Sequence, residues 1–183
     1  MPVKLSRLEH IEIPKEVDLT YVDKLTPRQF ENFVGVLLKT RGFDGVGITP
    51  MSGDNGVDVI AHKNGKHYAI QTKLYSGKVG AADVHEPIAG LRYYNCQAAM
   101  VVTNSYFTKP AKEYASKVEC ELIDRDILKR WLYEYRLVTS PSAANGVWLQ
   151  LSRHPNLLTI VVCVAVFVLL SLLFAAPLCE ILC

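Results

Sequence analysis

The sequence has no marked excess of charge of either sign, with 20 Lys and Arg against 18 Asp and Glu and a formal net charge of +2. Glu180 is the only charged residue after Pro155, so residues 1–155 carry +3. That balance is too mild to indicate a nucleic-acid partner by charge alone. A basic footprint would have to be local, and four lysines are equally compatible with a patch and with scattered surface residues: Lys63, Lys66, Lys73 and Lys78.

Cysteine is scarce in the first 155 residues, which contain only Cys96 and Cys120. The cytoplasmic placement inferred below argues against a disulfide bond between them. Cys179 and Cys183 lie near the C-terminus, where the sequence leaves open whether they are free, disulfide-bonded or acylated. The chain also lacks internal repeats and shows no second domain that would read a modified base.

Charge is absent altogether from Leu157 to Ala176, a run of twenty residues. A helix needs about 20 apolar residues to cross the hydrocarbon core of a bilayer. The run is apolar throughout rather than striped, which argues against a buried core helix. Its C-terminal position excludes a cleaved signal peptide. The sequence therefore predicts one membrane-spanning helix at residues 157–176.

The charges that flank this run predict its orientation. Arg153 and His154 precede it, whereas Glu180 is the only charged residue that follows. Positively charged flanks stay on the cytoplasmic side of a membrane. We therefore expect a single-pass protein of the cell membrane, with the N-terminal domain in the cytoplasm and residues 177–183 outside.

The first predicted helix begins with a clear capping pattern. Thr26 can cap it, Pro27 suits the first helical position, and Gln29 completes a capping box. Gly42 is expected to end the helix. Apolar residues at helical spacing predict one buried stripe: Phe30, Phe33, Val34, Leu37 and Leu38.

Helices and strands then alternate along the chain. The predicted elements are a strand near 46–48, hairpin strands at about 56–61 and 67–75, a helix over 81–94, a strand at 98–103, a helix over 109–117, a strand at 121–123 and a helix over 125–135 capped by Asp124. This order predicts an α/β fold with a mixed central β-sheet flanked by helices. Residues 1–24 are expected to form a strand or a partly ordered arm.

The hairpin carries the most specific signal, because Asn64-Gly65 between apolar runs favours a two-residue type I′ turn. Such a turn pairs residue 63 with 66 and, continuing along the strands, residue 58 with 71. Directly opposed residues share one face of a sheet, and side chains repeat with a period of two. Asp58, Gln71 and Lys73 are therefore predicted to meet on one patch.

The chemistry available to that patch is metal-assisted hydrolysis of a phosphodiester. Asp58 supplies a carboxylate oxygen of the kind Mg²⁺ prefers, and Gln71 supplies a neutral oxygen. A metal bound there would generate a nucleophilic hydroxide and neutralise charge on the phosphate. Lys73 offers a compact positive charge to the attacking water or the phosphate oxygens.

These residues resemble the Mrr-like restriction endonucleases of the PD-(D/E)xK nuclease superfamily, best known for acting on modified DNA. The resemblance covers about Leu25 to Trp131 and rests on five separated blocks in order: Phe30-Glu31-Asn32-Phe33-Val34, Arg41-Gly42-Phe43, Ser52-Gly53-Asp54-Asn55-Gly56-Val57-Asp58, Gln71-Thr72-Lys73 and Val101-Val102-Thr103-Asn104. In the wider superfamily the position of Gln71 is usually Glu or Asp, whereas this branch typically carries Gln.

The resemblance implies a restriction-endonuclease-like core and a role for each site residue. Asp58 is the metal ligand, Gln71 a second ligand or water-orienting group, Lys73 the electrostatic catalyst, and Glu31 a further contributor to metal binding and catalysis. From the residues alone, an exposed acid near a helix start is the favoured interpretation of Glu31, and a turn-capping residue that of Asp54. His62 and His67 should oppose each other as solvated turn residues.

Together these features predict a Mg²⁺-dependent DNA endonuclease, with Mn²⁺ able to substitute, that serves restriction or defence against foreign or modified DNA. The expected partners are double-stranded DNA and the membrane. A second copy of the chain is also expected, because one site cuts only one strand of a duplex. The alternative is a non-catalytic DNA-binding or membrane-recruitment module with the same fold. The predicted organisation is an arm at 1–24, a nuclease domain at 25–136, a linker at 137–156, the anchor at 157–176 and a tail at 177–183.

Overall fold

The computed structural model describes residues 5–6, 8, 13–14, 16–50 and 55–139. The chain divides into two compact units, Met1–Thr139 and Ser140–Cys183, and only the first contains described residues. Within those ranges no helix has the length and apolar character needed to cross a membrane. The predicted anchor at 157–176 and the tail after it lie outside the described residues.

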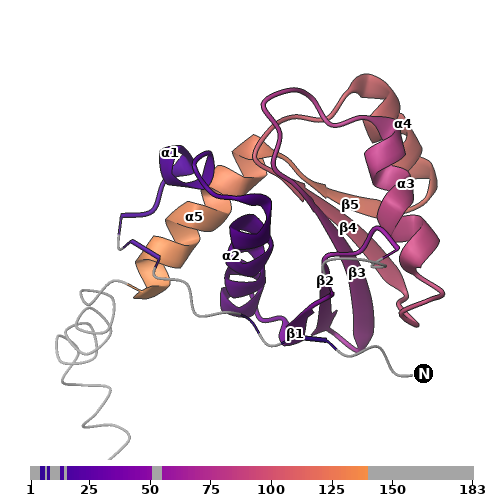
Figure 1. Ribbon diagram of the computed structural model, residues 1–183, viewed down its shortest axis with the longest axis horizontal. Coiled ribbons are helices and arrows are strands. Elements are labelled where there is room, and N and C mark those ends of the chain that lie inside the picture. Colours follow the sequence, from indigo (N-terminus) through magenta and orange to yellow (C-terminus); the bar gives the residue numbers. More distant parts are fainter. Residues whose placement is uncertain (1–4, 7, 9–12, 15, 51–54, 140–183) are drawn as a thin grey trace, which may run out of the picture. The chain divides into compact units, whose positions relative to one another are not determined.

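A single five-stranded sheet forms the centre of the first unit (Figure 1). Its strands, in spatial order, are β1 (Asp44–Ile48), β2 (Val59–Lys63), β3 (Lys66–Lys73), β4 (Ala98–Thr103) and β5 (Cys120–Ile123). The first three strands pair antiparallel, while β4 runs parallel to both β3 and β5. The mixed central sheet predicted from the sequence is therefore confirmed.

Helices cover both faces of this sheet (Figure 1). One face carries α1 (Leu19–Val22), α2 (Pro27–Thr40) and α5 (Arg125–Thr139), whose apolar side chains share a core with alternate residues of β2, β3 and β4. The other face carries α3 (Ala81–Gly90) and α4 (Lys109–Lys117), which bury a second apolar cluster against β4 and β5. The central strand β4 is thus buried on both faces, as its near-continuous apolar sequence requires.

The predicted start and buried face of α2 are both confirmed. Thr26 Oγ1 accepts a hydrogen bond from Gln29 N, and Gln29 Oε1 accepts one from Thr26 N, which completes the capping box. Gly42 follows the helix with a φ of 79°, a value that suits the residue after a helix end. The whole predicted stripe is fully buried: Phe30, Phe33, Val34, Leu37 and Leu38.

The hairpin has the predicted register. Asn64 and Gly65 have φ values of 52° and 75°, as a type I′ turn demands at both central positions. Lys63 pairs with Lys66, and the pairing continues without a slip to Val59 and Ile70. The regular ladder ends there, one pair earlier than predicted, but Asp58 N still donates to the carbonyl of Ile70 at 2.9 Å.

Several element boundaries differ from the predictions by a few residues, and one short helix was not predicted. The helix expected over 81–94 ends at Gly90, since the chain then turns and Asn95 adopts a φ of 53°. The last helix continues to Thr139, so residues 137–139 of the predicted linker are helical. The N-terminal arm contains α1, a helical turn whose N-cap Asp18 accepts a hydrogen bond from Tyr21 N at 2.9 Å.

Candidate active site

Asp58 lies directly before β2 and is only 8% exposed. Its Oδ2 accepts two hydrogen bonds from Thr72, one from the backbone N at 2.7 Å and one from Oγ1 at 3.0 Å. Thr72 stands between Gln71 and Lys73 on β3. The carboxylate is thus fixed on the residue that separates the other two predicted site residues, which brings all three to the same end of the hairpin.

Gln71 is 6% exposed, and its Oε1 has no hydrogen-bond partner among the described residues. Its Nε2 faces the Thr72 carbonyl at 3.4 Å. In this orientation of the amide, the nitrogen and not the oxygen faces the Thr72 carbonyl. Because buried polar atoms are normally paired, this oxygen is a candidate ligand atom.

The donor set suits a hard divalent cation. In the part of the chain that the structure describes, no three His, Cys, Asp or Glu side chains gather to form a metal site. Magnesium does not need such a cluster, since it keeps several waters and takes one or two carboxylates together with neutral oxygens. The residues present, Asp58 and the unpaired amide oxygen of Gln71, fit that requirement.

Lys73 ends β3 and is held by two acids of α3. Its Nζ lies 2.6 Å from Glu86 Oε2 and 3.4 Å from Asp83 Oδ1. Burial acts to lower the pKa of Lys73, but the hydrogen bond and attraction to Glu86, with weaker contributions from Tyr75 and Asp83, outweigh it and raise the pKa above its ordinary value. The side chain is therefore an ammonium ion at neutral pH. It acts as a charge and not as a base.

A close approach of backbones positions these acids. Gly56 has a φ of 72°, and a Cβ at this position would lie 2.5 Å from Glu86 Cβ. Gly90, at the other end of α3, lies against Val57 and the carbonyl of Asn55 with equally little room. Two glycines thus let α3 pack directly on the loop that leads to Asp58. This contact brings Glu86 to Lys73.

Glu31 is linked to the site through Arg28 and Thr49. Arg28 Nη1 donates to Glu31 Oε2 at 2.8 Å and to the Thr49 carbonyl at 3.2 Å. Thr49 in turn donates to the Asp58 carbonyl, from its backbone N at 2.9 Å and from Oγ1 at 3.1 Å. The helix that bears Glu31 is therefore coupled to the Asp58 backbone, and direct metal ligation by Glu31 stays a prediction.

The two predicted histidines lie at the opposite end of the hairpin. His62 and His67 oppose each other with their Nε2 atoms 2.9 Å apart, and Asp44 lies 3.3 Å from His62 Nδ1. They are beside the turn, as predicted, and take no part in the site. Asp54 lies outside the described residues.

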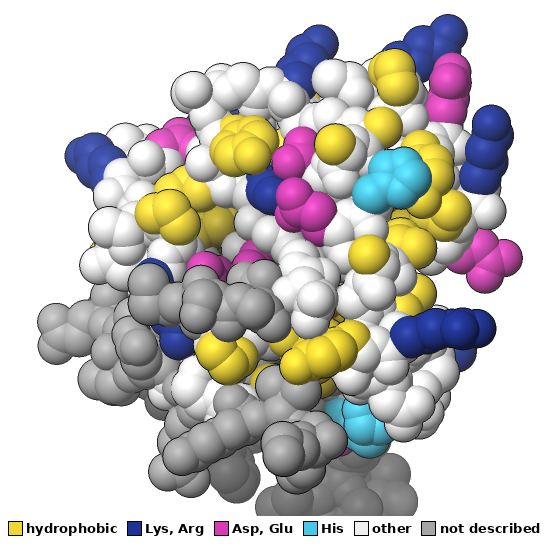
Figure 2. Space-filling model, turned by 45° about the vertical axis from the view of Figure 1, so that its right-hand side comes forward, with side chains coloured by type: hydrophobic (Ala, Val, Ile, Leu, Met, Phe, Trp, Pro, Cys, Tyr) yellow, Lys and Arg dark blue, Asp and Glu magenta, His cyan; other side chains and the backbone are white. Residues whose placement is uncertain are grey.

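The four lysines do not form one basic patch. Lys63 and Lys66 pair beside the turn, whereas Lys73 is seven residues further along β3, roughly 23 Å at the rise of a strand. Lys73 is also neutralised by its two acids. On the face shown in Figure 2, Lys and Arg side chains are scattered among acidic and apolar ones. Of the two alternatives for these lysines, scattered surface residues therefore fit the structure better than one basic patch.

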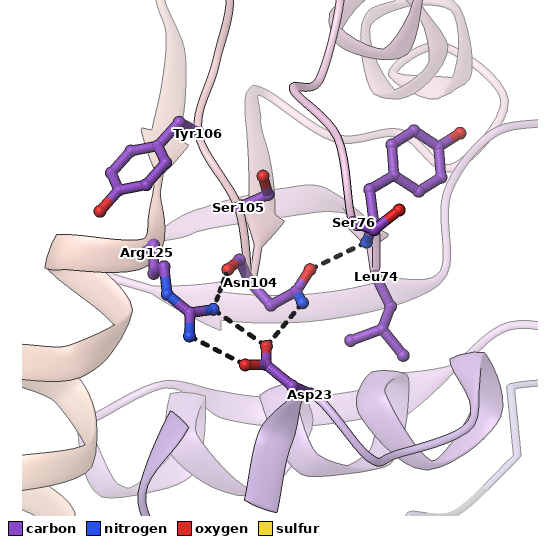
Figure 3. A pocket seen from close by; sticks show the side chains of 8 residues that line it. Asp23, Leu74, Ser76, Asn104, Ser105, Tyr106 and Arg125 are labelled. Carbon is purple, nitrogen blue, oxygen red and sulfur yellow. Dashed lines mark hydrogen bonds and ion pairs between the residues drawn. The ribbon is translucent and has the colours of Figure 1, made fainter. Parts of the chain in front are cut away.

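A polar network that was not predicted from the sequence lies beside the site (Figure 3). Arg125 donates to both carboxylate oxygens of Asp23, at 2.9 and 2.8 Å, and Asn104 Nδ2 donates to the same carboxylate at 2.8 Å. The hydrogen bond from Arg125, assisted by Asn104 and opposed by burial, holds the pKa of Asp23 below its ordinary value. The network ties the N-terminal arm to the ends of β4 and β5.

Comparison with known proteins agrees with this architecture. Residues 22–132 match the Mrr_cat family model, described as a restriction endonuclease. Because the match covers more than half of the chain, the protein belongs to this restriction endonuclease family and carries a nuclease catalytic domain. The family predicted from the sequence is thereby confirmed. No curated protein matches the chain.

Two solved restriction endonucleases share the fold. The structure titled MspJI restriction endonuclease in complex with a 27-mer oligonucleotide is 20% identical, with a TM-score of 0.52 over 69% of this chain and 32% of that one. The DNA modification-dependent restriction endonuclease AspBHI is 20% identical, with a TM-score of 0.50 over 72% and 37%. A protein of unknown function, AF1548, is 23% identical, with a TM-score of 0.45 over 51% and 55%. The chain thus spans about a third to a half of these proteins.

Proposed function

We propose that this protein is a membrane-anchored, Mg²⁺-dependent DNA endonuclease that hydrolyses phosphodiester bonds in restriction or in defence against foreign or modified DNA. The observation that carries the proposal is the buried Oε1 of Gln71, which has no partner among the described residues and lies at the same end of the hairpin as the anchored carboxylate of Asp58. Family membership gives the reaction class. The oligonucleotide bound to MspJI and the modification-dependent action of AspBHI support nucleic acid, and DNA in particular, as the substrate.

Each candidate site residue has a proposed role in metal binding or catalysis. Asp58 and Gln71 would hold the metal ion, for which Mn²⁺ can substitute, and Glu31 would contribute from α2. When bound, the ion supplies an activated water and neutralises charge on the phosphate. Lys73 would attract the phosphate oxygens, and since an ammonium has three donors it can hold Glu86 and Asp83 and still donate to substrate.

The membrane anchor and the orientation of the domain belong to the same proposal. The charge-free run at 157–176 and the basic residues before it support a single span with the catalytic unit in the cytoplasm. There the enzyme would meet incoming DNA and intracellular Mg²⁺. One site cuts one strand, so double-strand cleavage would require two copies or two encounters.

The direct test is a nicking assay with purified residues 1–140 and supercoiled plasmid. We expect nicking with Mg²⁺ or Mn²⁺ and at least a 100-fold loss in Asp58→Ala and in Lys73→Ala, because each removes charge stabilisation at the reacting phosphate. His62→Ala, at the far end of the hairpin, is the matched control and should cut normally. Equal activity in all four proteins would refute the assignment.

A second candidate function is a non-catalytic DNA-binding or membrane-recruitment module. It is favoured by the neutral Gln71 and by the pairing of Lys73 with two acids. DNA binding that needs no metal, without cleavage of modified or unmodified plasmid, would support this module over the enzyme.

A further inference from the structure

A cavity of about 550 Å³ opens where β3 and β4 end. Its walls come from the residues after each of these strands and from the start of α5, and Asp23 closes one side (Figure 3). In open α/β sheets, ligands bind at the carboxyl ends of the strands. The volume also falls in the range of small-molecule pockets. The cavity therefore has the place and size of a binding site, and none of the roles above uses it.

The charged groups in the cavity compensate one another. Arg125 makes a two-point contact with Asp23, and its Nη1 also donates to the Asn104 carbonyl at 2.6 Å. The Asn104 side chain donates to Asp23 and accepts from Tyr75 N at 2.8 Å. A guanidinium committed in this way is a poor receptor for a phosphate, which needs an uncompensated cation. The cavity suits an uncharged polar group better than an anion.

Two tyrosines line the cavity, and their rings favour an aromatic ring as the uncharged group that it binds. Tyr75 is 42% exposed and Tyr106 is 40% exposed, although both line the cavity. Their hydroxyls are tethered, since Tyr75 donates to Asp83 at 3.4 Å and Tyr106 donates to Asp126 at 3.2 Å. Tethered, partly exposed rings are the usual platforms on which unpaired bases stack.

Tyr75 connects the cavity to the candidate active site. Its ring centroid lies 5.9 Å from Lys73 Nζ, and its hydroxyl and that ammonium both contact Asp83. A base stacked on Tyr75 therefore has a phosphate of its own strand close to Lys73. The cavity and the active site are neighbours along the path of one strand.

We propose that this cavity takes an unpaired nucleobase, stacked on Tyr75 and Tyr106, from the strand that is cut. The inference rests on the proposed function for the identity of the polymer. The substrate strand is thus read with one base out of the helix, either in single-stranded DNA or after extrusion from a duplex. The pocket holds the ring by stacking and by the uncharged hydrogen-bonding groups around it.

The test is photocrosslinking of the full chain in detergent to single-stranded oligonucleotides that carry one 5-iodouracil, with EDTA present to prevent cleavage. Mass spectrometry of the crosslinked peptides is expected to identify Tyr75 or Tyr106. Affinity for the same oligonucleotide should fall by roughly 5-fold to 150-fold in Tyr75→Leu and in Tyr106→Leu, the range for losing one base–aromatic stack. Tyr93→Leu removes a tyrosine that is 58% exposed outside the cavity and should bind normally.

The outcomes separate this inference from the proposed function. Crosslinks at Tyr75 or Tyr106 in a protein that never cuts DNA support the pocket and refute the enzyme. Metal-dependent cleavage with crosslinks only at other residues, or with no crosslink, overturns the pocket and leaves the enzyme intact. Because the crosslink map is made with the unmodified chain, it decides the matter even if a leucine variant does not fold.

Discussion

At the scale of single residues, Gln71 shows a local conflict between stability and function. A buried polar atom without a partner costs about 1–3 kcal/mol, and the Gln71 Oε1 is such an atom among the described residues. Sites of this kind persist where a ligand completes them. A cation bound as proposed would complete this amide.

The first prediction follows from this conflict. Gln71→Leu keeps the volume and removes the unpaired oxygen, so the free energy of unfolding in EDTA should stay the same or rise by up to about 2 kcal/mol. Binding of Mn²⁺, measured by calorimetry, should be lost. A variant that unfolds more easily and still binds the metal would contradict the role given to Gln71.

Gln97 provides the matched control for this substitution. Its Oε1 accepts a hydrogen bond from His67 N at 2.9 Å, and its Nε2 donates to the Asn95 carbonyl at 2.9 Å. Gln97→Leu therefore removes two satisfied bonds at an exposed position and should lower the free energy of unfolding by about 0.5–1 kcal/mol. Metal binding should not change.

At the scale of helices and strands, the parts of the fold that follow from local chemistry were predictable. The hairpin register depends on Asn64 and Gly65, which accept a positive φ. The start of α2 depends on the capping box formed by Thr26 and Gln29. The positions of β4 and β5 were predictable from short apolar runs of strand length. The register in turn brought Asp58 to the same end of the hairpin as Gln71 and Lys73.

The rest of the site depends on tertiary contacts that leave no local pattern. Glu86 and Asp83 sit three residues apart on α3, a spacing typical of any exposed helix face, and only the packing of that helix brings them to Lys73. The contact between Asp23 and Arg125 joins residues 102 positions apart. The short helix α1 was missed because a single turn has too few residues to show a period.

A second prediction concerns the packing of α3 on the loop before Asp58. Gly56→Ala forces a side chain into a left-handed conformation and against Glu86 Cβ. Gly65→Ala imposes the same conformation, with a φ of 75°, but its Cβ meets no atom within 4 Å. We expect a loss of about 1–2 kcal/mol in Gly65→Ala and about 2–5 kcal/mol in Gly56→Ala, measured by urea unfolding. Equal losses would show that α3 does not crowd this loop.

At the scale of the whole molecule, the chain corresponds to only about a third of MspJI and AspBHI, namely 32% and 37% of their lengths. In this chain, the nuclease catalytic domain is the family match at residues 22–132.

The membrane anchor gives a third prediction. The full chain should sediment with membranes and resist extraction by alkaline carbonate, because the proposed helix of twenty uncharged, mostly apolar residues would insert across the bilayer. A protein ending at Thr139 should stay in the supernatant after the same treatment. Extraction of the full chain by carbonate would exclude a spanning helix at 157–176.

The central claim is that the end of the hairpin is a metal-dependent active site, and plasmid nicking by the full chain tests it most directly. With Mg²⁺, the unaltered protein should convert supercoiled plasmid to nicked circles, EDTA should stop the reaction, and Asp58→Ala should be inactive while it unfolds cooperatively like the parent. Nicking by Asp58→Ala at the parental rate, or nicking that continues in EDTA, would contradict the claim.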